Sequence, residues 1–349
     1  MDTDLVKRAG NRALSINPPN ADINLGRWGS NWGWTVFCLM AASTLGLLIW
    51  STTIARNRRA FHYLLTAVLA ISTISWYSMA SDLGSTPITV QFLRNNPLGA
   101  GYNGYPTRQI WYSRYIDWTI TTPLLLLSLL LITGLPLSII FITLFFNMLM
   151  IVCGLLGALT RSRYKWGYFV FACAALGYVL YQVFASGLRS ARRLGGGFGR
   201  AFLAAATLLA IIWPMYPICW ALSEGGNVIG VSEEFLWYGL LDLFSKPIFA
   251  FLLLSMLTKC DYGALRLRSG KISEDKIAEH EHRRGIEDHE QQGRGIEERS
   301  HEGGVGAAPV HDTAATGIPS PPPAHQAPSP THAATLPAGA PHTIMTPVA

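Results

Sequence analysis

Charged side chains are scarce in this sequence. They make up 14% of its 349 residues, whereas about a quarter is usual in soluble domains. Half of the residues are hydrophobic, and about 20 consecutive apolar residues cross the hydrocarbon core of a bilayer as a helix. Seven such runs occur, at approximately 30–54, 60–82, 110–132, 135–157, 166–186, 201–222 and 234–257. The sequence therefore predicts an all-α membrane protein, a bundle of seven transmembrane helices.

Three further absences narrow this interpretation. The apolar runs lack the alternation of apolar and polar residues that marks the strands of a membrane β-barrel. The polar segment 1–26 lacks the apolar core of a cleaved signal peptide. The cysteines lack the spacing of a disulfide framework or a metal site, so we expect them to be reduced. They are Cys38, Cys153, Cys173, Cys219 and Cys260.

The chain divides into three regions. Residues 1–29 form a polar extracellular segment, residues 30–260 hold the helices, and residues 261–349 form a cytoplasmic tail. The tail has too few apolar residues to offset the entropy cost of ordering, so we expect it to be largely disordered. The basic residues that flank the runs favour an orientation with the N-terminus outside and the C-terminus in the cytoplasm. We expect the membrane to be the plasma membrane. Between the second and third runs, ITVQF is bounded by turn residues and predicts a short hairpin over the outer mouth.

Four charged side chains lie inside the runs, away from their ends. Arg114 and Asp117 belong to the third run, and Asp242 and Lys246 to the seventh. The members of each pair are three or four residues apart and therefore share a helix face. A lone charge at the middle of the membrane costs at least about 2.5 kcal/mol. The two charged faces are therefore expected to meet inside the bundle.

A structural ion-pair cluster would satisfy these charges, but buried pairs contribute little net stability. Three functions stay open: a transporter with the lysine as its coupling site, another seven-helix receptor, or a lysine that carries a cofactor through a Schiff base. The rings of Trp118, Trp213, Tyr216 and Trp220 recur beside the charges on two helices. Together they would wall a flat apolar slot closed by the lysine. Such a slot suits a polyene.

Three motifs carry a resemblance to a known family. They are RYIDWTITTPLLLL at 114–127, WPMYPICW at 213–220 and LDLFSKP at 241–247. With these motifs in this order, the sequence resembles the microbial rhodopsins, most closely the fungal bacteriorhodopsin-like retinal proteins, over roughly residues 30–260. The resemblance implies a light-activated protein of the lipid bilayer that moves protons or signals, and neither an enzyme nor a nucleic-acid-binding protein.

The resemblance also implies roles for the charged residues. Lys246 would bind all-trans retinal as a protonated Schiff base, with Asp117 and Asp242 as paired counterions and with Arg114 and an ordered water completing the cluster. Asp117 would be the proton acceptor, and Thr121 would hydrogen-bond it. Tyr216 would hydrogen-bond Asp242. The remaining positions that match the retinal site of the family are Trp118, Thr122, Leu125, Met150, Gly154, Phe169, Trp213, Pro217 and Trp220.

Two further positions bear on proton movement. Glu224 and Glu234 match the proton-release pair of the family. Ser128 lies eleven residues beyond Asp117, where the bacteriorhodopsin-like pumps carry the carboxylic acid that reprotonates the Schiff base. A serine hydroxyl cannot deliver a proton at accessible cost. If the protein works as the family does, Ser128 in place of the acid therefore implies a slow photocycle.

Two functions follow. The first is a slow, light-driven outward proton pump. The second is a photosensory rhodopsin that signals through helix movement and the cytoplasmic tail, which the missing donor and the long tail favour. A homo-oligomer and a cytoplasmic partner of the tail are further expectations. The presence of acceptor and release carboxylates favours the pump.

Overall fold

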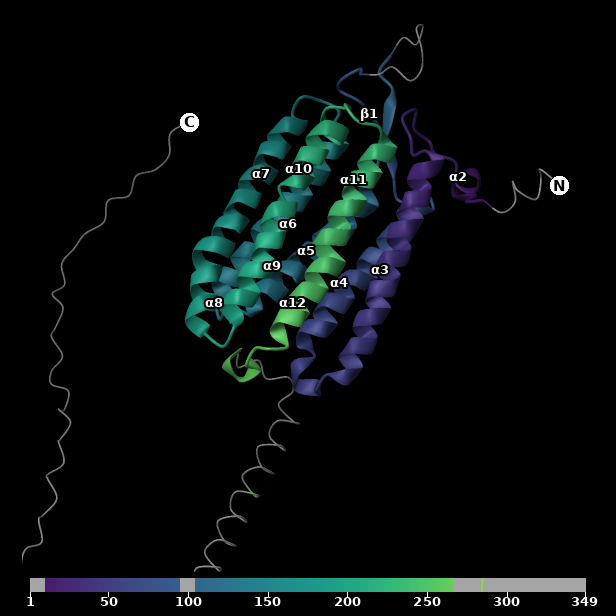
Figure 1. The fold of residues 1–349 in the computed structure, drawn as a ribbon. Helices are drawn as coiled ribbons and strands as arrows, with labels where there is room; N and C mark the ends of the chain where they lie inside the picture. Colours follow the sequence, from purple (N-terminus) through teal and green to yellow (C-terminus); the bar gives the residue numbers. More distant parts are fainter. Residues whose placement is uncertain (1–9, 95–103, 266–283, 285–349) are drawn as a thin grey trace, which may run out of the picture. The chain divides into compact units, whose positions relative to one another are not determined.

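Seven helical rods stand side by side (Figure 1) in the computed structural model, which describes residues 10–94, 104–265 and 284. The predicted seven-helix bundle is therefore confirmed. The rods are, in chain order, α3 (Arg27–Thr53), α4 (Ala60–Ala80), α5 (Tyr112–Leu131), α6 (Leu137–Leu159), α7 (Lys165–Tyr181) continued by η2 (Gln182–Gly187) and α8 (Leu188–Leu194), α9 (Phe198–Ile212) continued by α10 (Met215–Trp220) and η3 (Ala221–Gly225), and α11 (Val231–Leu243) continued by η4 (Phe244–Ile248) and α12 (Phe249–Leu257).

The ends of the rods differ from the predicted ones by a few residues. The first rod begins at Arg27 rather than at 30, and the fifth continues to Leu194 rather than ending at 186. A short helix, α2 (Ala13–Ile16), lies within the predicted N-terminal segment. Most of the predicted tail, at 266–283 and 285–349, lies outside the described residues. The structure therefore bears on the helical region and only on the start of the tail.

Six of the rods in the described part of the chain are long and apolar enough to cross a membrane. The other rod is α5, which carries Arg114 and Asp117 in its first half. Its neighbours bury both side chains, since Arg114 and Asp117 are 0% and 1% exposed. The charged face of α5 therefore points into the bundle, while Ile116 and Ile120 on its other side are 55% and 45% exposed.

Large apolar side chains cover the outside of the bundle. Those on the helical rods that are at least 60% exposed include Leu45, Ile49, Ile74, Phe141 and Phe171. Apolar surface on this scale is unusual in water-soluble monomers, but it is what a bilayer solvates. The protein is therefore a multi-pass integral membrane protein, as its apolar runs predicted.

The ring of helices closes between the first and last rods, because α3 packs on both α4 and α11. Gly33 permits this close approach: a Cβ atom there would lie 2.7 Å from a ring carbon of Phe235. Phe235 in turn contacts Trp76 and Trp111, with ring centroids 5.2 Å apart in both pairs. These three rings fill the interior on the side where α3, α4, α5 and α11 converge.

A two-stranded hairpin covers one end of the bundle (Figure 1). Strands β1 (Thr86–Thr89) and β2 (Thr107–Ile110) are antiparallel, with Thr86 opposite Ile110. The predicted hairpin is confirmed, although β1 contains only the first two residues of ITVQF. Ile23 makes a parallel bridge to Arg108, so the N-terminal segment lies against the hairpin. This end is called the hairpin end below, and the opposite end the inner end.

Three rods widen into a π-helical turn, at η2, η3 and η4. Pro247 lies inside η4, and proline has no backbone N–H to donate to the helical ladder. Turns of this kind often mark functional positions. Here one of them contains Lys246.

Candidate functional site

Lys246 lies between two carboxylates in the middle of the bundle. Its Nζ atom is 2.5 Å from Oδ2 of Asp117 and 2.9 Å from Oδ2 of Asp242. All three side chains are at most 1% exposed. Asp242 and Lys246 come from the last rod and Asp117 from α5, so the structure places the two charged faces together. The positive charge of a buried ammonium thus has the paired carboxylates that it requires.

The two carboxylates differ in the donors around them. Asp242 accepts hydrogen bonds from Nε1 of Trp76 at 3.0 Å, from Nε1 of Trp118 at 3.1 Å and from the hydroxyl of Tyr216 at 2.8 Å. Donors of this kind stabilise the anionic form of a carboxylate. Asp242 is thus held in place by donors from three different helices.

Asp117 has fewer donors. Besides Lys246, Oγ of Ser72 donates to its Oδ1 at 2.8 Å. Thr121 was expected to hydrogen-bond this acceptor, but its hydroxyl donates to the backbone carbonyl of Asp117, at 2.8 Å, as a helical residue often does toward position i−4. Ser72, on α4, therefore takes the place expected for Thr121. More of the lone pairs of Asp117 are left for a proton.

Among the described residues, the ion pairs recorded for Arg114 are with two glutamates rather than with Asp117 or Asp242. Its Nη1 atom lies 2.6 Å from Oε1 of Glu234 and 3.8 Å from Oε1 of Glu224. The structure thus brings the two glutamates together around Arg114, toward the hairpin end. A guanidinium pairs readily with carboxylates in a water-poor site, and no carboxylate other than this pair is recorded within ion-pairing distance of it among the described residues.

The glutamate cluster has members that the sequence did not reveal. Nη2 of Arg108, on β2, lies 2.6 Å from Oε2 of Glu234. The hydroxyl of Tyr115 donates to Oε2 of Glu224 at 2.6 Å, and Nζ of Lys165 donates to the backbone carbonyl of Glu224 at 2.9 Å. Arg108 and Lys165 are 1% and 2% exposed. Both residues stand in or beside loops in the sequence, where basic residues are usually solvated, so no local pattern marks them as buried.

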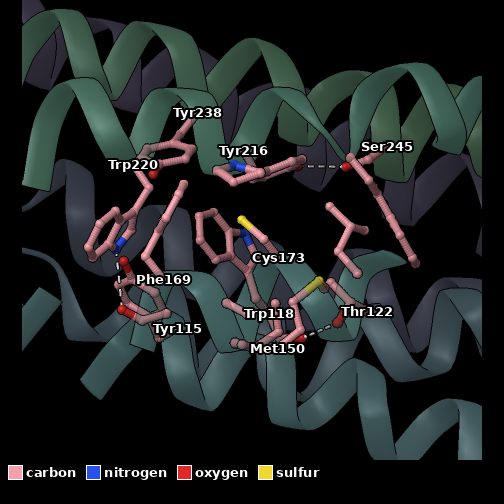
Figure 2. A pocket seen from close by; sticks show the side chains of 16 residues that line it. Tyr115, Trp118, Thr122, Met150, Phe169, Cys173, Tyr216, Trp220, Tyr238 and Ser245 are labelled. Atoms are coloured by element: carbon pink, nitrogen blue, oxygen red, sulfur yellow. Dashed lines mark hydrogen bonds between the residues drawn. The ribbon is translucent and has the colours of Figure 1, made fainter. Parts of the chain in front are cut away.

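An apolar pocket lined largely by aromatic side chains lies beside the lysine cluster, with Ser245 and Tyr216 at its near end (Figure 2). The rings of Phe169 and Trp220 stack at 5.2 Å between centroids at one end. At the other end the hydroxyl of Tyr216 bonds both Oγ of Ser245, at 2.9 Å, and Asp242. That end therefore borders the carboxylates that hold Lys246.

Most of the residues predicted from the family resemblance line this pocket. They are Trp118, Thr122, Met150, Gly154, Phe169, Trp213, Tyr216, Pro217 and Trp220. Lys246 is not itself in the lining, but Ser245 is. Leu125 is not in it either and is completely buried in the helix core. The lining residues that the prediction missed are Tyr115, Ile151, Ala172, Cys173, Leu176, Tyr238 and Ser245.

Ser128 is buried on α5, toward the inner end. Its hydroxyl donates to the backbone carbonyl of Leu125 at 2.7 Å. The hydroxyl is thus bonded within its own helix, and the position offers no acid. The inner half of α5, from Thr121 onward, contains no charged side chain.

The fold and this lysine centre together define a multi-pass membrane protein of the microbial rhodopsin class. The family described as "Bacteriorhodopsin-like protein" matches residues 28–260. The chain is 45% identical over 269 residues to Protein FDD123 of Trametes versicolor, with 77% of this chain and 91% of that protein covered. This chain belongs to the bacteriorhodopsin-like family, which implies a retinal chromophore.

Two solved structures of light-driven proton pumps are also similar to this chain. The pump of Coccomyxa subellipsoidea is 35% identical with a TM-score of 0.62, and 67% of this chain and 98% of that chain are covered. The pump LR (Mac) of Leptosphaeria maculans is 32% identical with a TM-score of 0.63, and again 67% and 98% of the two chains are covered. Both likenesses cover the helical region and not the whole chain.

Proposed function

We propose that this protein is a light-driven outward proton pump in which Lys246 binds all-trans retinal as a protonated Schiff base. One observation carries the proposal: Nζ of Lys246 lies 2.5 Å from Oδ2 of Asp117, beside a long aromatic pocket. The description of two similar structures as light-driven proton pumps supports it.

The residues present fit retinal. The pocket is apolar and walled by aromatic rings, as a polyene requires, and its polar end borders an amine that can bond an aldehyde. Once bound, retinal would supply a light-driven change of shape that moves the nitrogen of Lys246. Trp118 and Trp213 would hold the chain of the polyene, and Phe169 and Trp220 its far end. The two carboxylates would neutralise the positive charge on the lysine nitrogen.

Asp117 is the better proton acceptor of the two carboxylates. Besides the lysine, Asp242 accepts hydrogen bonds from Trp76, Trp118 and Tyr216. Asp117 accepts one from Ser72, so among the described residues more of its lone pairs are free to take a proton. The proton would therefore leave the nitrogen of Lys246 for Oδ2 of Asp117. The charge of the cluster would then change on α5, three residues from Arg114.

The exit would run toward the hairpin end. Arg114 shares a face of α5 with Asp117 and pairs with Glu234. Loss of the negative charge at Asp117, three residues from Arg114, would leave the guanidinium to interact with the two glutamates alone. A stronger interaction with Arg114 favours their anionic forms and hence release of a proton from the glutamate cluster. We assign the hairpin end to the extracellular side, with the N-terminus outside and the C-terminus in the cytoplasm, as the flanking basic residues favour.

Ser128 would make the pump slow. With no carboxylic acid at this position, return of a proton to the nitrogen of Lys246 has no donor on α5.

The absence of this acid also supports a second function, a photosensory rhodopsin that signals through helix movement. A cytoplasmic partner for the tail belongs to that alternative, and the tail beyond residue 265 lies almost entirely outside the described residues.

Illumination of vesicles that contain the coloured protein would decide between the two. A pump changes the pH of the lumen in light, and a protonophore abolishes the change. The Asp117→Asn variant is the matched control, because it keeps the pocket and removes the acceptor. A correctly oriented, coloured sample that moves no protons would exclude the pump and leave the sensor.

A further inference from the structure

His62 is a buried titratable residue that the proposed function does not use. It lies near the start of α4, at the inner end, and is 2% exposed. All the other histidines of the sequence fall at or beyond position 280. In the described part of the chain, neither ring nitrogen of His62 has a hydrogen-bond partner, and neither has Oγ1 of Thr66. Buried polar atoms nearly always find a partner, so these three point to bound water.

Thr66 and His62 share one face of α4, because they are four residues apart. Thr66 is the residue nearer the lysine cluster, and it is 8% exposed. Water that satisfies all three atoms would extend from the imidazole toward the middle of the bundle. A site that offers two ring nitrogens and a hydroxyl has enough polar partners to hold a water molecule.

The depth of His62 in the bundle can be read from a hydrogen bond. Ser72 on α4 donates to Asp117 on α5 at 2.8 Å, so these two residues lie at the same level. His62 is ten residues before Ser72, and Ser128 is eleven residues after Asp117, on neighbouring helices of opposite direction. At 1.5 Å per residue, both lie roughly 15–16 Å from that level. His62 is therefore at the depth where α5 lacks an acid.

His62 also borders the rod that carries the lysine. Trp50 of α3 contacts the imidazole edge to face, with centroids 5.3 Å apart, and stacks on Phe251 of α12 at 6.2 Å. Phe251 follows Lys246 by five residues. The turn η4 and helix α12 both pack against α4. The imidazole is thus beside the inner half of the last rod, below the lysine.

Few charges surround the imidazole. The guanidinium of Arg59 faces it from the start of its own helix, and the backbone of Arg58 is close enough to interact with the ring, although not in hydrogen-bonding geometry. Of the other elements that pack on α4, α12 has no charged side chain and η4 has Lys246. Helix α5 has only Arg114 and Asp117, in its first half, and α3 has only Arg27, at the hairpin end. No carboxylate of these helices competes with His62 for the role of acid in the inner half.

We propose that His62 is the internal proton donor of this protein. The N–H bond of the imidazolium breaks, the proton passes through water held at Thr66, and an N–H bond forms at the nitrogen of Lys246. The neutral imidazole then takes a proton from the solvent at the inner end. The inference rests on the proposed function, because a donor is needed only if that nitrogen gives its proton to Asp117.

Flash photolysis of the pigment tests the donor. His62→Phe keeps the ring and removes the acid, and return of the lysine nitrogen to its protonated form is expected to slow at least about tenfold, a modest share of what general acids contribute. Added azide or imidazole should restore the rate, and so should Ser128→Asp in the same chain. Trp50→Phe, which alters packing beside the ring but no acid, should leave the rate within about twofold of the parent. An unchanged rate in His62→Phe would overturn the inference.

A second measurement does not depend on the pigment. In the retinal-free full-length chain with labelled histidine, the NMR signal missing from a second variant, His62→Gln, belongs to His62. An imidazole usually changes charge between about pH 5 and 8, and a proton donor must gain and lose its proton. We therefore expect the His62 signal to titrate with pH. Thr66→Val should shift the midpoint of that titration. A ring that stays in one protonation state from about pH 4 to 9 would refute the donor even if His62→Phe fails to fold. Absence of a coloured adduct would instead refute the proposed function.

Discussion

Arg108 and Glu234 form a buried ion pair in which Nη2 of the arginine lies 2.6 Å from Oε2 of the glutamate. Arg114 binds the other oxygen of the same carboxylate, also at 2.6 Å. Arg108 further donates to Oδ1 of Asn227 at 2.9 Å and to the carbonyl of Ile229 at 2.7 Å. One side chain of the hairpin therefore joins the proposed exit to the loop before α11.

Arg108→Gln should destabilise the protein and disturb proton release. Removing one partner of a buried ion pair typically costs about 3–5 kcal/mol, so the midpoint of thermal unfolding in detergent should fall. A pH-sensitive dye should report an altered release phase after a flash. Arg108→Lys keeps the charge without the planar fork and should recover part of both effects. Wild-type stability and release in Arg108→Gln would show that the hairpin plays no part in the exit.

Lys246→Ala should yield a folded but colourless protein, since Lys246 supplies the amine that lies beside the end of the pocket. The measurement is the visible spectrum after addition of all-trans retinal. Ser245→Ala is the matched control, because it alters the adjacent lining residue and leaves the amine; it should still form a coloured adduct. A visible band in Lys246→Ala would contradict the assignment of the anchor.

Asp117→Asn should shift the absorption band to the red and abolish transfer of a proton from the lysine nitrogen to an internal acceptor. The reason is that a neutral amide stabilises the positive charge on that nitrogen less than a carboxylate does. Asp242→Asn should keep proton transfer, because Asp117 is still present. If the colour of Asp117→Asn equals that of the parent, Asp242 must be the dominant counterion.

Ser128→Asp should accelerate the late part of the photocycle about tenfold or more, within the usual range for a general acid. The substitution places a carboxylic acid on α5 at the depth of His62. Ser128→Asn adds a similar volume without an acid and should leave the rate low. Equal rates for Ser128→Asp and the parent would mean that reprotonation is not the slow step.

Asp82 should make stability depend on pH. Burial raises the pKa of its carboxyl group, and the hydrogen bond from Gln109, at 2.6 Å, opposes this shift. Because the folded form holds its proton to higher pH than the unfolded form, stability should fall as pH rises from about 4 through the raised pKa. Asp82→Asn keeps an acceptor for Gln109 and tolerates the left-handed backbone there, with φ of 62°. Thermal unfolding of this variant should lose that pH dependence, and an identical profile would contradict it.

The sequence predicted the bundle because long apolar runs have few alternatives in a membrane, and it predicted the lysine centre because four buried charges can be tolerated only together. It missed Ser72 and Trp76, which bond Asp117 and Asp242. Both are ordinary residues in an apolar helix, and nothing local shows which face of that helix meets the charges. Arg108 was missed because its burial depends on how a hairpin folds over the bundle, which is a relationship between distant segments.

The π-helical turn at Phe244–Ile248 has a consequence for any helical-wheel diagram of the last rod. Such a turn contains one more residue than an α-helical turn, and one residue corresponds to about 100° around the axis. A wheel drawn with constant angular steps from Val231 would therefore point the residues of α12 in the wrong direction. When the faces of this rod are assigned from sequence, the helical-wheel angles should be calculated separately for the residues before and after the π-helical turn.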